Sequence, residues 1–447
     1  MLLEFAISNY KCFTKEIVFK MTPSPKIQDL KYSILKAKHN KNIKALSSAV
    51  IYGPNASGKT NLIGAMEVLK SIVKRGHIRN EENESNSRNI AQYKLELIPN
   101  IKSRRNTPVK FRIKFICESY LVDYSLSIVL GRFLDLSTAR KVAEEKLMIN
   151  NKIVFLRKNN SLKIGSIESI IGKKYFADNF NKAAIKESAE HNLDEKELFL
   201  NSFKALYSNT FTSLILNWFE QNLYIIYNAN TLKSYPEIEQ KADDKEALAI
   251  DEEVNKAVSE FGFTGDILAY EKRGDSEETE PISIIRGKDK RAMVLNLEVF
   301  ESYGTMRFAN IFPLLREAMF YGNTIVIDEF DASLHPMALM SIINVFHNED
   351  INKKGAQLIF NTHNPIFLNR NLFRRDEIKF VERNEESGVF EHYSLADFGT
   401  SGETSVRNTE NYLNNYFVSK YGAIKDIDFT PVFERIMREG DSGDEKA

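Results

Sequence analysis

Gly53-Pro54-Asn55-Ala56-Ser57-Gly58-Lys59-Thr60 is the stretch that decides how this chain folds. It follows the short apolar run 48–52 and precedes residues 61–73, whose apolar side chains recur at helical spacing. The pattern G-x-x-x-x-G-K-[ST] between a strand and a helix is typical of a loop whose backbone N–H groups enclose phosphates. We therefore expect an α/β fold built around a nucleotide-binding loop.

The residue types in this loop each suit that chemistry. Gly53 and Gly58 allow the backbone to curl, and the N-terminus of the following helix adds partial positive charge. We expect Lys59 to reach the β- and γ-phosphates and the Thr60 hydroxyl to ligate Mg²⁺. The expected nucleotide-binding set is therefore residues 53–60 with Asn61, and the expected cofactors are ATP and Mg²⁺.

A second stretch, Thr324-Ile325-Val326-Ile327-Asp328-Glu329, is an apolar strand that ends in two adjacent carboxylates. Asp328 has the chemistry to hold Mg²⁺ through water, and Glu329 could polarise an attacking water as a general base. A strand that merely ends in solvated acids would look the same. The phosphate loop upstream favours the functional interpretation.

Two further segments are candidates for the same site. The apolar run 357–360 leads into Asn361-Thr362-His363-Asn364-Pro365, and His363 could hydrogen-bond a γ-phosphate and the attacking water. Ser302, Gly304 and Thr305 precede a helical pattern, where a hydroxyl and backbone amides could bind an anion. Read alone, a structural histidine and an ordinary N-capped helix are the simpler explanations of these two segments.

The amino-acid composition excludes several classes of protein. The 447 residues are 43% hydrophobic, enough for a large core, and no run approaches the roughly 18 apolar residues that cross a bilayer. The two cysteines, Cys12 and Cys117, cannot alone form a disulfide framework or a four-ligand zinc site, so we expect both to pack in the core. The N-terminus does not read as a secretory signal. We expect a cytoplasmic protein with no membrane contact.

The net charge of zero hides an asymmetry along the chain. Residues 1–120 carry 22 basic and 9 acidic side chains, whereas residues 237–280 carry 15 acidic and 5 basic ones. A basic N-terminal part can attract polyanions, although solvated loops explain it equally well. The basic part includes a lysine-rich loop: Lys31, Lys36, Lys38, Lys41 and Lys44. The acidic stretch predicts a solvated segment or a docking face.

Together, the phosphate loop and the segments IVIDEFD, ESYGTMR and THNP resemble an ABC-type ATPase head of the RecF- and SMC-like branch. Within that branch the chain is similar to AbiL/RloA-type ATPases and to the ATPase subunit of PARIS phage-defence systems. The resemblance implies a mixed sheet around the phosphate loop plus an antiparallel β subdomain. It divides the chain into an N-terminal ATPase lobe (1–150), a mainly helical insertion (160–285), a C-terminal ATPase lobe (290–430) and a short tail (431–447).

The resemblance also implies roles for individual residues. Residues 53–60 match the Walker A loop, Asp328–Glu329 the Walker B pair, 302–305 the signature motif, 331–334 the D-loop and His363 the switch histidine. The signature reads SxGT here and departs from the LSGGQ form of transporters. Gln92 is the candidate for the Q-loop, although a surface glutamine would read the same way.

In the family that the chain resembles, heads pair so that the signature helix of one copy covers the γ-phosphate held by the other. We therefore expect a homodimer or a higher homo-oligomer with ATP sandwiched between heads. The resemblance implies a sensor subunit of an anti-phage defence system that controls a separate toxic effector, expected to be a TOPRIM-type nuclease. About two dozen residues follow residue 425, too few for a nuclease domain, and Asp426 and Asp428 lack the rest of a TOPRIM site.

The alternative function is a RecF/SMC-like ATPase that binds DNA directly in repair or chromosome maintenance. On an alternating strand, Lys110, Arg112 and Lys114 would share one face and could contact phosphates. The wet face of an antiparallel sheet would show the same pattern. A transporter subunit, a GTPase and a kinase are disfavoured, because the LSGGQ form, an N-K-x-D motif and an HRD catalytic loop are missing.

Overall fold

The computed structural model describes most of the chain, in thirteen stretches of residues. They are 1–79, 96–104, 106–131, 140–176, 181–227, 248–249, 251–263, 265–272, 279–286, 292–399, 405–407, 409–425 and 427–444. Gln92, the Q-loop candidate, lies outside them, as does Asp426.

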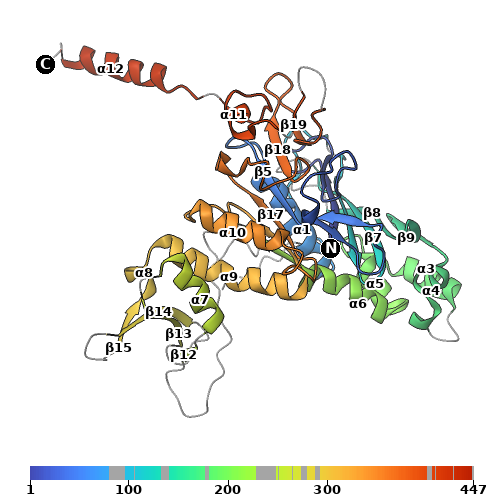
Figure 1. Ribbon diagram of the computed structural model, residues 1–447. Coiled ribbons are helices and arrows are strands. Elements are labelled where there is room, and N and C mark those ends of the chain that lie inside the picture. The colour runs from blue at the N-terminus through green and yellow to red at the C-terminus, as the bar shows by residue number, and fades with distance from the viewer. Residues whose placement is uncertain are drawn as a thin grey trace.

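A mostly parallel sheet forms the centre of the molecule (Figure 1). Its strand order is β11-β16-β17-β5-β18-β19, and each adjacent pair is parallel except β18 with β19. The bounds are β11 (Leu223–Ile226), β16 (Thr324–Ile327), β17 (Gln357–Asn361), β5 (Ser48–Tyr52), β18 (Ile378–Arg383) and β19 (Phe390–Ser394). Because β5, β16 and β17 run in parallel, the loops that follow them meet at one edge of the sheet.

The central strands are buried on both faces, as expected for parallel strands covered on each side. In β5, alternate residues enter two different cores: Ala49 and Ile51 pack in one, and Val50 and Tyr52 in the other. The first core contains α1 (Lys59–Arg75), and the second contains α9 (Tyr303–Tyr321) and α10 (Pro336–His347). The continuous apolar runs of these strands thus reflect two-sided burial.

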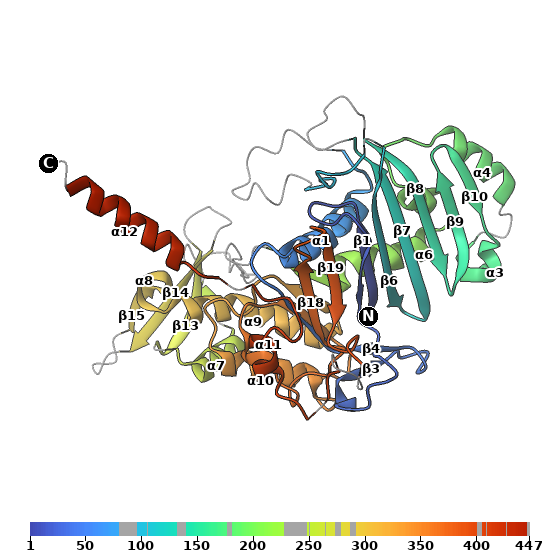
Figure 2. The same ribbon diagram turned by 90° about the horizontal axis from the view of Figure 1, so that it is seen from above.

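An antiparallel sheet packs beside this centre, with strand order β10-β9-β8-β7-β6-β1-β2 (Figure 2). Its bounds are β1 (Leu2–Ser8), β2 (Ile17–Lys20), β6 (Val109–Cys117), β7 (Tyr120–Val129), β8 (Lys141–Ile149), β9 (Lys152–Lys158) and β10 (Ser161–Ile164). Along β6 buried residues alternate with more accessible ones, because one face joins the core and the other meets water. The predicted fold class, a mixed sheet around the phosphate loop plus an antiparallel β subdomain, is confirmed.

The segment expected to be a mainly helical insertion contains helices and strands. The helices are α3 (Ile167–Ile171), α4 (Lys182–His191), α5 (Phe199–Leu206), α6 (Asn209–Asn217) and α7 (Glu252–Phe261). Strand β11 from this segment joins the central sheet beside β16. A separate antiparallel sheet follows: β12 (Leu248–Ala249), β13 (Ile267–Lys272), β14 (Thr279–Arg286) and β15 (Ala292–Asn296). Part of the segment therefore belongs to the central sheet, and the domain boundaries stay a prediction.

Three smaller features complete the fold. The hairpin β3 (Ile34–Lys36) and β4 (Lys44–Leu46) precedes β5, and α8 (Leu297–Phe300) precedes α9. Helix α11 (Tyr412–Phe417) packs on the 3-10 turn Pro365–Phe367. The expected tail holds helix α12 (Thr430–Asp444), which extends away from the body (Figure 1). Its exposed residues include Val432, Phe433, Ile436 and Met437. None of the helices in the described ranges is both long enough and apolar enough to span a membrane.

Candidate functional site

The phosphate loop connects β5 to α1. At its two outer glycines, Gly53 and Gly58, neighbouring atoms leave no room for a side chain. Gly53 has φ 156°, and a Cβ there would stand 2.1 Å from the Val381 carbonyl oxygen. Gly58 has φ 100° and precedes the first residue of α1; a Cβ there would lie 2.9 Å from Cys12 Sγ. The loop is thus pressed against β18 on one side and against the loop after β1 on the other. Only glycine fits this path without displacement.

The other residues of the predicted set follow the same path. The Ser57 N–H donates to the Pro54 carbonyl over 3.2 Å, which closes a turn around Asn55 and Ala56, both exposed. Asn61, in the first turn of α1, donates through Nδ2 to Cys12 Sγ at 3.1 Å. The sulfur of Cys12 therefore helps to seat the helix. Cys12 and Cys117 are both free thiols.

Lys59 is folded back on its own loop. Its Nζ donates to the carbonyl oxygens of Gly53 at 2.7 Å and Pro54 at 3.1 Å, and the residue is 5% exposed. Burial lowers the pKa of Lys59 to about 8, against the opposing effect of nearby carboxylates: Asp328, Glu329 and Asp331. The Lys59 ammonium is a charged donor for an anionic group that enters the loop, and its positive charge opposes the repulsion that these three carboxylates exert on that group.

The two sequence motifs meet across 268 residues of chain. The Thr60 hydroxyl donates to Asp328 Oδ1 over 3.1 Å. Mg²⁺ holds its oxygen ligands at about 2.1 Å in octahedral geometry, which separates two adjacent ligand oxygens by roughly 3 Å. The spacing of these two oxygens therefore fits a magnesium site in which both oxygens are direct ligands.

Sequence reasoning missed Asn361, which joins both carboxylate-bearing positions. Its Nδ2 donates to Asp328 Oδ1 at 2.5 Å, and its Oδ1 accepts a hydrogen bond from the Glu329 N–H. Asn361 is the last residue of β17 and is 1% exposed. A polar residue at the end of an otherwise apolar strand was the available signal, because strand ends of parallel neighbours meet at one edge.

Glu329 follows β16 in a left-handed conformation with φ 50°, which non-glycine residues seldom adopt. Two contacts hold its backbone: Asn361 accepts from its N–H, and the Arg307 guanidinium donates to its carbonyl oxygen. The side chain is half-buried. Its backbone is therefore fixed by two neighbouring elements while the carboxylate keeps access to water.

His363 lies two residues beyond the end of β17, and its side chain is exposed. Its pKa is below the ordinary 6.5, first through partial loss of hydration and second through the positive charge of Lys59. Asp331, Glu329 and Asp328 oppose this effect. The imidazole thus shares an electrostatic environment with the phosphate-loop lysine and the strand-end acids, and it is neutral at pH 7.

The predicted signature residues begin α9. Ser302 is the N-cap, and its Oγ accepts from the Thr305 N–H at 3.1 Å. A Cβ on Gly304 would stand 2.4 Å from the Ser333 carbonyl oxygen, so α9 is packed against residues 331–334. Among the hydrogen bonds of the described residues, none joins Ser302, Gly304 or Thr305 to the phosphate loop of the same chain.

Comparison with solved structures finds many similar chains, 80 of them. One is the "SMC head domain from Thermotoga maritima", 14% identical, with 88% of this chain and 98% of that one covered at a TM-score of 0.35. Another is the "Crystal structure of the SmcHead bound to the C-winged helix domain of ScpA", 13% identical, with 88% and 97% covered at a TM-score of 0.34. No curated protein matches the sequence.

A family model matches residues 48–369, most of the chain, and spans the phosphate loop, the strand-end carboxylates, Asn361 and His363. With the site geometry given above, the chain therefore belongs to the AAA_21 family, described as "AAA domain, putative AbiEii toxin, Type IV TA system".

Proposed function

We propose that the protein binds ATP at the carboxyl edge of the central sheet and hydrolyses it. The observation that supports this most strongly is the 3.1 Å hydrogen bond from Thr60 to Asp328, which joins the phosphate loop to the acidic strand end. A polar contact between such distant positions, backed by Asn361, is what a shared triphosphate and metal site requires.

In this mechanism the loop amides and Lys59 bind the phosphates. Lys59 exchanges its bonds to the Gly53 and Pro54 carbonyls for phosphate oxygens. Magnesium, when bound at Thr60 and Asp328, supplies charge neutralisation at the phosphate oxygens. Glu329 accepts a proton from the attacking water as general base. His363, neutral at pH 7, can donate one ring N–H to the phosphate or the water and keep the other nitrogen as acceptor.

We further propose that ATP joins two or more copies of the chain. Ser302, Gly304 and Thr305 would complete the anion cage of a second copy with the N-terminus of α9. Three large apolar side chains lie in the sequence within or just after the site motifs and are exposed: Tyr303 at 50%, Met337 at 65% and Ile366 at 43%. Their burial against another copy would offset the loss of freedom on association.

The biological role that we propose is that of a sensor subunit in anti-phage defence. It would control a separate toxic effector, of the TOPRIM nuclease class, through ATP-dependent assembly in the cytoplasm. The support is the resemblance given above and the family description, which names a toxin of a type IV toxin–antitoxin system. Co-purification of the protein with the product of a neighbouring gene tests this role.

The alternative, direct DNA binding by the β6 row, receives less support. The three basic residues do share the accessible face of β6. However, Arg112 pairs with Asp123 through two hydrogen bonds of 3.0 and 2.7 Å, and Lys114 Nζ lies 3.3 Å from Glu4. Intramolecular carboxylates thus already neutralise most of this row.

The experiment that tests the ATPase proposal compares Glu329→Gln with wild type for ATP turnover, ATP binding and assembly mass. We expect the variant to bind ATP, to lose turnover by about 100-fold or more, and to accumulate in the larger assembly. Glu385→Gln, on an exposed turn, is the matched control. Equal turnover in Glu329→Gln and wild type would refute the general-base role.

A further inference from the structure

A second cleft lies at the end of the central strands opposite the phosphate loop. It has a volume of about 680 Å³. Four parts of the chain line it: residues between 32 and 39 around β3, the end of α9 at Tyr321 and Gly322, residues between 346 and 355 before β17, and Met1 with Ile116 and Glu118 of the antiparallel sheet region. An adjoining cleft of about 590 Å³ shares Ile34, Lys36 and Glu349 with it. The strands of the sheet separate this region from the ATP site by roughly 15 Å.

Positive charge dominates the lining of the two clefts. Six lysines line them against two glutamates, so the net formal charge is +4. These lysines are Lys31, Lys36, Lys38, Lys44, Lys353 and Lys354, and all are exposed. In the described part of the chain none of the six forms an ion pair with a carboxylate, in contrast to Arg112 and Lys114 on β6. Their charge is available to an anionic ligand.

Large aromatic rings are exposed beside these lysines. Tyr32 is 42% exposed at one wall, and Tyr321 is 62% exposed at another. Phe320, 66% exposed, packs edge-to-face on Tyr321 with ring centroids 5.0 Å apart, and Lys354 Nζ lies 5.8 Å from its centroid. Exposed rings next to lysines that form no ion pair within the described residues are the two components of a surface that stacks bases and follows a phosphate backbone.

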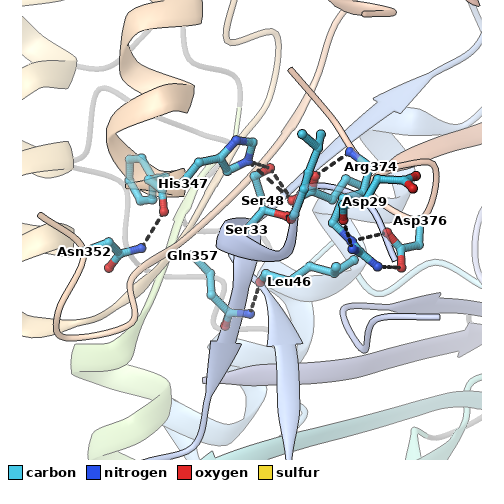
Figure 3. A network of polar contacts seen from close by, with 12 residues as sticks. Asp29, Ser33, Leu46, Ser48, His347, Asn352, Gln357, Arg374 and Asp376 are labelled. Carbon is cyan, nitrogen blue, oxygen red and sulfur yellow. Dashed lines mark hydrogen bonds and ion pairs between the residues drawn. The ribbon is translucent and has the colours of Figure 1, made fainter. Parts of the chain in front are cut away.

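Buried polar contacts hold the elements that carry the cleft walls (Figure 3). Ser48 Oγ lies 2.8 Å from His347 Nε2 and donates to Glu377 at 3.1 Å, so the start of β5 is tied to the end of α10. Asn352 Nδ2 donates to the carbonyls of Phe346 and Ala356, which fixes the loop that carries Lys353 and Lys354. Gln357 Nε2 donates to the Leu46 carbonyl at 2.9 Å and so anchors the β3–β4 hairpin. The walls are thus preorganised.

We propose that this cleft binds single-stranded nucleic acid. The lysines contact backbone phosphates, and the rings of Tyr32 and Tyr321 stack on unpaired bases. An acidic polypeptide would use the lysines but would leave the exposed rings in water. A duplex would hide its base faces from those rings. The inference goes beyond ATP hydrolysis and uses no residue of the ATP site, so it stands or falls separately.

The test is fluorescence anisotropy with the full-length protein, without nucleotide, on labelled 15-nucleotide oligo(dT), oligo(U), a 15-base-pair duplex and poly-glutamate. We expect single strands of one or both kinds to bind more tightly than the duplex. Tyr321→Ala should weaken binding about 5- to 150-fold, the range for loss of one stacked base, while Tyr321→Phe retains it.

The lysine contribution is measured by the variant Lys36→Glu/Lys38→Glu/Lys353→Glu. Three lost phosphate contacts should reduce the slope of log affinity against log salt by about 2. The matched control is Lys152→Glu/Lys163→Glu/Lys173→Glu, three exposed lysines on and beyond the far antiparallel strands, which makes the same change in net charge. We expect the control to bind within about twofold of wild type, with circular dichroism establishing that each variant is folded.

Four results would overturn the proposal. They are the absence of single-strand binding, an equal loss in the control triple variant, unchanged binding by Tyr321→Ala, and duplex or poly-glutamate binding as tight as that of the single strands. The last of these would identify a general polyanion surface or an acidic protein partner.

Discussion

Replacement of Asn361 by alanine is the sharpest test of the site architecture. The side-chain amide is 1% exposed and makes two hydrogen bonds, one to the Asp328 carboxylate and one from the Glu329 N–H. A neutral hydrogen bond contributes about 1 kcal/mol and one to a charged group about 2 kcal/mol. We therefore expect Asn361→Ala to lower the free energy of unfolding by about 3 kcal/mol. Turnover of ATP should fall by about 100-fold, because the Asp328 carboxylate loses a hydrogen bond and the Glu329 backbone loses one of the contacts that position it.

Urea unfolding can be followed by the fluorescence of Trp218, the single tryptophan, which is 2% exposed and stacked on Phe115 at 3.7 Å. Trp218 packs in the core that also contains Val326 of β16 and Ile359 of β17, so its signal reports on the affected strands. Asn371→Ala, at an exposed position, is the control and should change the free energy of unfolding by less than about 0.5 kcal/mol.

The variant Asn361→Asp tests the electrostatic part of the same reasoning. It places a carboxylate where Nδ2 now lies 2.5 Å from Asp328 Oδ1. Two such close carboxylates raise the pKa of one of them above its value in the unfolded chain. The folded state then binds a proton more readily, so the loss of stability should be largest at pH 7 and shrink toward about pH 5. A loss in Asn361→Ala below about 1 kcal/mol with normal turnover would refute the whole argument.

Four further outcomes follow from the site. Gly53→Ala should abolish ATP binding in a filter assay, because its Cβ would stand 2.1 Å from the Val381 carbonyl oxygen. Gly304→Ala, with a Cβ 2.4 Å from the Ser333 carbonyl oxygen, should lower the free energy of unfolding by about 1–3 kcal/mol; unchanged melting would contradict this packing. Lys59→Met should lose ATP binding, and its stability relative to wild type should fall as pH rises above 8. In wild type, the pKa of Lys59 near 8 makes the folded state gain stability as pH rises, since the unfolded lysine stays protonated until about 10.5. ATP turnover should fall as the pH drops below the ordinary histidine pKa of 6.5, because His363 then gains a proton, and the decline should weaken in His363→Gln.

Local sequence patterns were sufficient to predict the strands and the helix at the centre of the molecule. The strand before Gly53, the helix after Thr60 and the strand before Asp328 each have an unambiguous pattern, and the structure has β5, α1 and β16 at those places. The expected N-cap of the helix after Ser302 is also present. Because parallel strands place their carboxyl ends together, the contact between Thr60 and Asp328 could be expected from the sequence.

Features that depend on contacts between distant segments could not be predicted from local sequence patterns. Strand β11 has four residues, Leu223–Ile226, inside a region that reads as helical, and only its pairing with β16 makes it part of the central sheet. The roles of Asn361 and Arg307 depend on neighbours 22 to 33 positions away, and single polar residues carry no periodic signal. The lysine-rich loop was visible in the sequence, but Lys353 and Tyr321 join it only through the fold.

The contact between Arg307 and the Glu329 carbonyl has a consequence for cooperativity. Arg307 lies on the first turns of α9, the helix whose N-terminus would face the nucleotide of a neighbouring copy. A displacement of this helix by the neighbour's phosphate would be passed by the Arg307 guanidinium to the backbone of Glu329, the residue proposed to activate water. The conformation of each catalytic centre in a pair would thus depend on whether the other centre holds a nucleotide. Hydrolysis at the two centres could then be simultaneous or alternating without rotation of a whole domain.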